Sequence, residues 1–169
     1  MDDQRWQTVE AWMRQHGDMV LRTIYLITQD REASEELAQE VFIRAYRKLH
    51  QFKGESKAAT WLYTIAANLA RNHLRRRRDL PVDREFVESA SGPADDYRPD
   101  HTVAKAEDRK RILREVSALP VDLRAAVSFY YLDELSVEET AAALRVPAGT
   151  VKSRLARARE QLRHALVSG

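Results

Sequence analysis

The stretch from Leu135 to Arg163 constrains the fold most, because it reads as two short helices joined by a tight turn. The first helix is predicted to open at Ser136 or Val137, and the two glutamates that follow suit the positive N-terminal end of a helix. It must end before Pro147, because proline disfavours helical geometry in the residue that precedes it. Pro147 itself can stand at or near the first position of the second helix.

The second of these helices has two faces of different chemistry. Apolar residues recur at helical spacing and predict a buried stripe: Val151, Leu155, Ala158 and Leu162. The opposite face carries small, basic and hydrogen-bonding side chains: Lys152, Ser153, Ala156 and Arg157. A face of this kind is what reading a major groove requires, so the pattern indicates a helix-turn-helix with DNA as the leading partner. An ordinary helical hairpin with a solvated charged face is the alternative for this stretch alone.

The rest of the chain also reads as helix, with no internal repeat and no strand candidate longer than a few residues. Apolar periodicity predicts helices over residues 6–27, with a possible interruption near Gly17, and over residues 30–52, 59–78, 103–119 and 122–132. We therefore expect an all-α fold. A three- or four-helix N-terminal domain would be followed by a linker and a four-helix C-terminal domain.

Charge is distributed unevenly, although the net charge of the chain is only +2. Residues 1–78 and 109–169 are each net positive, whereas residues 79–108 between them are net negative. The acidic segment holds three of the five prolines and little apolar periodicity, which is typical of a flexible linker. Two basic domains joined by one linker are suited to binding nucleic acid. A chance fluctuation in a charge-rich helical protein is the alternative.

The helix predicted over residues 59–78 carries a second candidate face. Leu62, Ile65, Ala66 and Leu69 form its expected core stripe. Beside that stripe lie an aromatic ring, a hydroxyl, an amide and two guanidinium groups: Trp61, Thr64, Asn68, Arg71 and Arg75. Such a face suits unstacked bases and their backbone. Simple core packing is the alternative for Trp61, and a solvated helix end is the alternative for the arginines from Arg75 to Arg78.

Several function classes find no support in the sequence. The chain has no cysteine, which excludes disulfides and thiolate metal sites and favours a reducing cytoplasm. Its five histidines show no ligand spacing, so we expect no metal, no cofactor and no catalytic residue. No apolar run approaches the ~18 residues that span a bilayer, and the acidic N-terminal segment is unlike a secretory signal. We expect a cytoplasmic protein that is not an enzyme and inserts into no membrane.

Three segments together resemble a known family. They are ASEELAQEVFIRAYRKLHQF at residues 33–52, FKGESKAATWLYTIAANLARNHLRRR at residues 52–77, and LPVDLRAAVSFYYLDELSVEETAAAL followed by VPAGTVKSRLARAREQLR. The chain resembles bacterial sigma-70 family sigma factors of the small extracytoplasmic-function (ECF) group. The resemblance implies sigma region 2 at residues 1–78 and region 4 at residues 109–169, with the acidic linker at 79–108 in place of region 3.

The resemblance also implies a function and its residues. Such proteins bind core RNA polymerase, direct it to promoters and help to open the duplex, and an anti-sigma factor is a further implied partner. The polymerase-binding residues would be Glu36, Gln39, Glu40 and Arg44. The minus-ten element, as duplex and as melted non-template strand, would be contacted by Lys53, Gly54, Glu55, Ser56, Trp61, Asn68, Arg71, Asn72 and Arg75. The minus-thirty-five element would be contacted by Lys152, Ser153, Arg154 and Arg157.

Within the minus-thirty-five set Arg154 lies on the flank of the predicted reading face, so we expect it to contact phosphate. Some positions depart from the pattern of the family. Leu62 stands where housekeeping sigma factors carry a second tryptophan, which implies weaker melting. Glu36 replaces the usual aspartate. Arg145 stands where the turn often has glycine, and a positive φ there would cost about 1 kcal/mol or more unless the turn takes another form.

Two further expectations concern the whole chain. Both domains are net positive, so we expect that any compact arrangement would have to be mediated by the acidic linker or by a partner. The alternative function is a dimeric helix-turn-helix regulator of duplex operator DNA. That alternative explains residues 109–169 but leaves the second face and the linker without a role.

Overall fold

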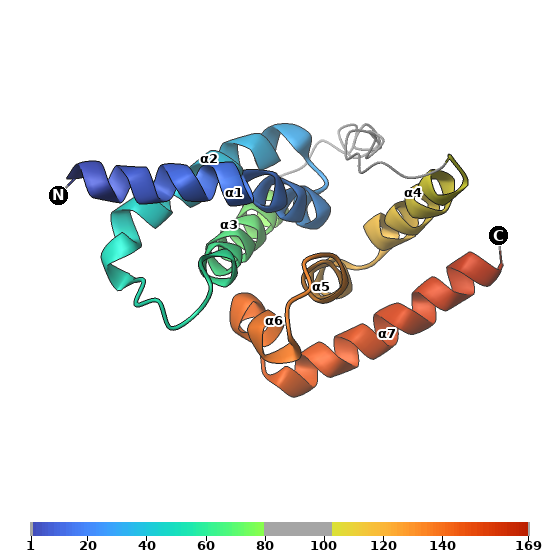
Figure 1. Ribbon diagram of the computed structural model, residues 1–169. Coiled ribbons are helices and arrows are strands. Elements are labelled where there is room, and N and C mark those ends of the chain that lie inside the picture. Colours follow the sequence, from blue (N-terminus) through green and yellow to red (C-terminus); the bar gives the residue numbers. More distant parts are fainter. Residues whose placement is uncertain (1, 80–102, 169) are drawn as a thin grey trace.

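The computed structural model describes residues 2–79 and 103–168, and the regular structure in these residues is helical (Figure 1). The N-terminal unit consists of α1 (Asp2–Thr28), α2 (Arg31–Lys48), a 3-10 turn (Leu49–Gln51) and α3 (Ala58–Asp79). The C-terminal unit consists of α4 (Val103–Ala118), α5 (Val121–Val127), a π-helical turn (Ser128–Leu132), α6 (Val137–Leu144) and α7 (Ala148–Val167). The expected all-α class is confirmed.

Helices α1, α2 and α3 pack on one another, and α3 does so through its predicted stripe. α1 runs through Gly17 without the interruption considered possible there. α2 begins where predicted, because the Asp30 side chain caps it by accepting a hydrogen bond from the Ala33 N–H at 3.0 Å. Fully buried side chains of this unit come from all three helices: Val20, Ile24, Ile27, Val41, Leu62, Ala66 and Leu69.

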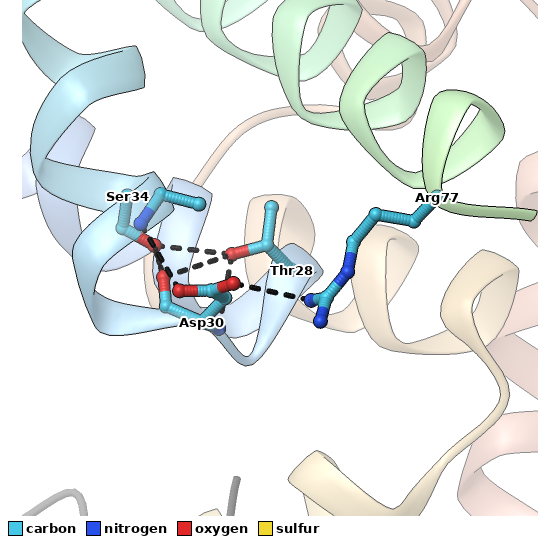
Figure 2. A network of polar contacts seen from close by, with 5 residues as sticks. Thr28, Asp30, Ser34 and Arg77 are labelled. Atoms are coloured by element: carbon cyan, nitrogen blue, oxygen red, sulfur yellow. Dashed lines mark hydrogen bonds and ion pairs between the residues drawn. The ribbon is translucent and has the colours of Figure 1, made fainter. Parts of the chain in front are cut away.

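Figure 2 shows the polar contacts that fix the junction of α1 and α2. The Thr28 and Ser34 hydroxyl oxygens are 3.0 Å apart, and the Ser34 hydroxyl donates to the Asp30 carbonyl. The second oxygen of the Asp30 carboxylate accepts a hydrogen bond from the Arg77 guanidinium at 3.1 Å. One arginine of the basic run at the end of α3 therefore links this helix to the start of α2.

The helix-turn-helix forms as predicted. Ser136 caps α6, and its hydroxyl oxygen accepts from the Glu139 N–H at 3.0 Å. Arg145 ends the helix with φ 55° and ψ 46°, so this position does adopt the left-handed conformation that glycine favours. Pro147 then stands directly before the first residue of α7.

The two units pack directly against each other. α3 contacts α6, and α1 contacts α5 and the π turn. The Tyr63 ring meets the Phe129 ring edge-on with centroids 5.3 Å apart, and buried residues of both units form one hydrophobic cluster. The expectation that the linker or a partner must mediate a compact form is therefore wrong, because the two units share buried apolar residues and Arg22 of one unit pairs with Asp133 of the other. The linker residues 80–102 lie outside the described part of the chain.

Candidate nucleic-acid and polymerase interface

The predicted minus-ten face of α3 begins in an aromatic cluster. The Trp61 ring lies 5.9 Å from the Trp12 ring and 5.4 Å from the Phe52 ring, centroid to centroid. Trp61 is only partly buried by these contacts, and its remaining surface lines a cavity with Asn68. Trp61 therefore packs against the core and also contributes to a polar face, so both interpretations made from the sequence apply to it.

That cavity lies between the N-terminal unit and the helix-turn-helix. It has a volume of about 160 Å³ and is lined from α2, its following turn, α3 and the helix-turn-helix by Arg44, Lys48, Gln51, Trp61, Thr64, Ile65, Asn68 and Arg145. Cations from two elements face an aromatic ring and an amide, a combination that suits phosphate and base groups. Arg44 is also ion-paired, because its Nε lies 2.8 Å from the Glu40 carboxylate.

The basic residues farther along α3 differ in exposure. Arg71 is half-buried and donates a hydrogen bond to the Leu144 carbonyl at the end of α6. Burial lowers the pKa of Arg71, and the nearby positive charges of Arg145 and Arg154 lower it further. Arg75 is exposed and donates to the Asn72 side-chain oxygen at 3.2 Å. Of the predicted minus-ten arginines, Arg75 is exposed to solvent, whereas the Arg71 guanidinium is hydrogen-bonded within the protein.

The predicted base-holding loop, residues 53–56, lies between the 3-10 turn and α3 and is exposed throughout. Gly54 has a φ of 73°, a conformation that side chains with a Cβ rarely adopt. A Cβ added there would meet no atom within 4 Å, so the glycine is needed for its backbone angle and not for space.

The exposed face of α7 agrees with the predicted helical faces. Val151, Leu155 and Ala158 are buried. Exposed residues of the other face include Lys152, Ser153, Ala156 and Arg157. The Arg154 side chain is only 19% exposed and lies 4.0 Å from the Asp122 carboxylate, which places it at the flank of this face.

The predicted polymerase-binding residues lie on α2, with Arg44 at the cavity that α2 shares with α3 and Arg145. Glu36 and Gln39 are exposed, and Glu40 and Arg44 are half-buried and paired with each other. Ile43 stands among them and is 45% exposed, although it was not predicted. Its signal was present in the sequence, because Ile43 lies one turn beyond Gln39 and outside the buried stripe of α2.

A buried polar cluster between the two units was also missed. The Asp133 carboxylate, just after the π turn, accepts hydrogen bonds from Arg22 at 2.7 Å and from Thr23 at 2.9 Å. Burial of its own hydroxyl group raises the pKa of Tyr63 on α3, and the Asp133 carboxylate raises it further. Burial raises the pKa of Asp133, and Arg22 opposes that shift. No local sequence pattern could have revealed this cluster, because its members are up to 111 residues apart.

A second buried cation joins the units. The Arg124 guanidinium on α5 donates to the Leu119 carbonyl at 3.0 Å and to the Ile27 carbonyl at the end of α1. Among the described residues no group of three metal-ligating side chains is found. No helix in the described ranges is long and apolar enough to cross a membrane.

Comparison with known proteins gives consistent matches for both units. Residues 12–79 match the sigma-70 region 2 family, and residues 109–162 match the sigma-70 region 4 family. The chain is 38% identical over 154 residues to the RNA polymerase sigma-H factor of Pseudomonas aeruginosa, covering 87% of this chain and 80% of that protein. It is 40% identical over 134 residues to the ECF RNA polymerase sigma-E factor of Escherichia coli K12, covering 75% and 70%.

Solved structures show the same fold. The sigma factor RpoE from Bartonella quintana, in complex with the anti-sigma factor NepR, matches with a TM-score of 0.72, 23% identity and coverage of 93% of this chain and 95% of that one. CnrH in complex with the cytosolic domain of CnrY matches with a TM-score of 0.68, 18% identity and coverage of 99% and 95%. From the family matches and the relatives, the chain belongs to the ECF group of sigma-70 factors and is a transcription initiation factor that directs RNA polymerase to promoters.

Proposed function

We propose that this chain binds core RNA polymerase through α2 and reads its promoter with two separate helices, α3 and α7. The supporting observation is the two independent polar faces, one on each helix, each backed by a buried apolar stripe in a segment that matches a sigma region. Region 2 would occupy residues 1–78 and region 4 residues 109–169, with residues 79–108 as the connecting linker.

The polymerase contact is assigned to α2. Glu36, Gln39, Glu40 and Arg44 supply charged and amide groups, and the exposed Ile43 adds an apolar centre. An apolar side chain ringed by polar ones is the arrangement found at the centre of many protein interfaces.

The promoter contacts are divided between duplex reading and strand capture. The exposed residues of α7, with Arg154 on phosphate, would read the minus-thirty-five duplex. The loop 53–56 would hold a base flipped out of the minus-ten element, and Trp61, Asn68, Arg71, Asn72 and Arg75 would hold the melted strand and its duplex edge. Flipping a base costs a few kcal/mol, which such contacts can offset.

The burial of Leu62 supports the inference that this chain has only a limited capacity to melt DNA. Its side chain is fully buried in the core of the N-terminal unit and presents nothing to a base. The chain would therefore depend more on a good promoter sequence than a sigma factor with an exposed second aromatic residue.

The chain would act by binding and not by catalysis, in the cytoplasm where core polymerase works. Its structural neighbour RpoE is bound to an anti-sigma factor. We propose a partner of that class for this chain also.

Run-off transcription tests the proposal directly. Purified chain and core polymerase from the same bacterium are incubated with a library of promoter fragments from that genome. New discrete transcripts that align on two common elements are expected. No transcripts and no binding to core polymerase, together with a gel shift of duplex DNA by the chain alone, would replace the proposal with the dimeric regulator.

A further inference from the structure

The cavity between α2, α3 and the helix-turn-helix is lined by cations that the protein does not neutralise. Lys48 and Arg145 both line it and are both exposed. Within residues 2–79 and 103–168, neither side chain makes an ion pair or a hydrogen bond with another group. The third cation, Arg44, is already paired with the Glu40 carboxylate at 2.8 Å. Two positive charges at this cavity are therefore left for a ligand.

One of these two cations is held there at a conformational cost. Arg145 has φ 55° and ψ 46°, the left-handed conformation that a residue with a Cβ disfavours. Backbone outliers of this kind concentrate at functional sites, where the surrounding structure fixes them. A guanidinium that is carried by a strained residue, lines a cavity and has no partner among the described residues points to an anionic ligand.

The same cavity holds groups that suit a planar ring. Trp61 lines it, and the contacts of that ring with Trp12 at 5.9 Å and Phe52 at 5.4 Å fix its position. Asn68 and Gln51 each add a side-chain amide, which can both donate and accept a hydrogen bond. A fixed aromatic ring for stacking, amides for the polar edge of a base, and cations for phosphate are together the recognition groups of a nucleotide.

The volume of the cavity restricts the size of the base. It is about 160 Å³. An engineered cavity of ~150 Å³ in another protein takes up one benzene molecule, so one six-membered ring fits here. The ribose and phosphate would then lie outside this volume, where Lys48 and Arg145 are exposed. The base of best fit is therefore a pyrimidine, since a purine has two fused rings.

The charge of the cavity favours a free nucleotide over a nucleic-acid strand. A terminal phosphate monoester carries a charge of about −1.5 to −2 at neutral pH. Each phosphate inside a strand carries only one negative charge. Two cations without partners match the monoester more closely.

We propose that this cavity binds a free pyrimidine nucleoside monophosphate. Its ring lies against Trp61, its polar edge faces Asn68 and Gln51, and its phosphate is held by Lys48 and Arg145. Trp61 and Asn68 also belong to the proposed minus-ten set, but the nucleotide site requires neither polymerase nor promoter DNA.

Calorimetric titration of the free, full-length chain with uridine monophosphate measures the affinity. Saturable binding of one molecule per chain is expected. Uridine, which lacks the phosphate, is expected to bind at least about tenfold more weakly, because it loses hydrogen bonds to charged groups. Adenosine monophosphate is expected to bind more weakly as well, because its fused rings exceed the cavity.

Variants of the two cations test where the phosphate lies. Arg145→Gly and Lys48→Ala are each expected to weaken the binding of uridine monophosphate by about tenfold. Glycine suits the left-handed backbone at position 145, so a loss of affinity in Arg145→Gly would not come from a less stable fold. Arg47→Ala removes a neighbouring exposed cation that does not line the cavity, and it is expected to leave the affinity unchanged.

Nuclear magnetic resonance tests where the ring lies. The chain has three tryptophans, so its indole N–H groups give three signals. Uridine monophosphate is expected to shift the signal of Trp61. Trp6, which is exposed on α1 and does not line the cavity, is the internal control.

Several results would overturn the proposal. They are an absence of saturable binding up to ~1 mM, equal affinity for uridine or for adenosine monophosphate, and undiminished affinity in Arg145→Gly. A shift of Trp6 without a shift of Trp61 would place the nucleotide elsewhere. These measurements use neither polymerase nor DNA, so their failure would leave the proposed function standing, and failed run-off transcription would leave the nucleotide site standing.

Discussion

At the scale of single residues, Arg145 shows most clearly how the sequence departs from the simplest way to build its fold. Its N–H bonds back to the carbonyls of α6 while its own backbone is left-handed. An L-residue with a Cβ pays for that conformation, whereas glycine does not. The side chain also reaches the cavity beside Asn68. A strained arginine is therefore kept at a position that glycine would suit better.

Replacing Arg145 by glycine tests this strain. Arg145→Gly is expected to raise the free energy of unfolding by up to about 1 kcal/mol, because the left-handed residue no longer carries a Cβ. Urea denaturation measures the change. Arg145→Ala removes the same side chain but keeps the strain, so it should bring no gain. A gain of equal size in both variants would place the cost in the charge of Arg145 and not in its backbone.

The exposed face of α7 yields a second residue-scale prediction. Arg157→Ala is expected to weaken the preference for the native minus-thirty-five sequence by about 1–3 kcal/mol, the usual worth of one good base contact. Transcription from promoters mutated in that element measures the preference. Arg163→Ala, at an exposed arginine farther along the same helix, is the control. An unchanged preference in Arg157→Ala would remove this residue from the reading set.

At the scale of elements, periodicity and capping predicted which residues form each helix. Asp30, Ser136 and Pro147 marked helix starts through their own backbone chemistry, and the structure has them at those places. The π turn at Ser128–Leu132 was not predicted, because a π turn keeps the composition of the helix that it extends. The pairing of Arg77 with Asp30 was not predicted either, since it depends on how α3 crosses the start of α2.

The role proposed for α3 predicts a separation between two activities. Asn68→Ala is expected to impair promoter opening more than polymerase binding, because Asn68 lies on α3 and the proposed polymerase face lies on α2. Permanganate reactivity of unpaired thymines reports opening, and a pull-down with core polymerase reports binding. Ile43→Ala is the reciprocal variant and should reduce binding first. Equal loss of both activities in Asn68→Ala would count against the assignment.

At the scale of the whole molecule, the sequence predicted two basic units but not their contact. Both units carry a net positive charge, and this repulsion argues that they should stay apart. The structure brings together Tyr63 with Phe129, which are 66 residues apart, and Arg22 with Asp133, which are 111 residues apart. Shared apolar burial and the Arg22–Asp133 ion pair outweigh the repulsion between the two net charges, because exposed like charges are screened by salt over about 10 Å.

The buried carboxylate predicts how the contact responds to pH. Burial raises the pKa of Asp133 while the two units are packed together, whereas this pKa would return to its ordinary range once the units separate. The packed arrangement therefore holds a proton more tightly, and lowering the pH through the raised value shifts the equilibrium toward the packed arrangement. The interdomain distance at a series of pH values measures the shift. Asp133→Asn should remove this component, whereas an identical response in that variant would assign it to other groups, such as the histidines.

The contact of α6 with α3 also bears on domain exchange between sigma factors. A chimera that takes region 4 from a relative would bring a new minus-thirty-five helix, but also new residues in place of Asp133, Glu139 and Arg145. Those residues face Arg22, Thr60 and Asn68 of region 2 in the native chain. A hybrid with mismatched partners would lose these contacts, so its promoter choice and the packing of its two units would change together. Specificity can be transferred cleanly only if the residues on both sides of the contact are transferred with it.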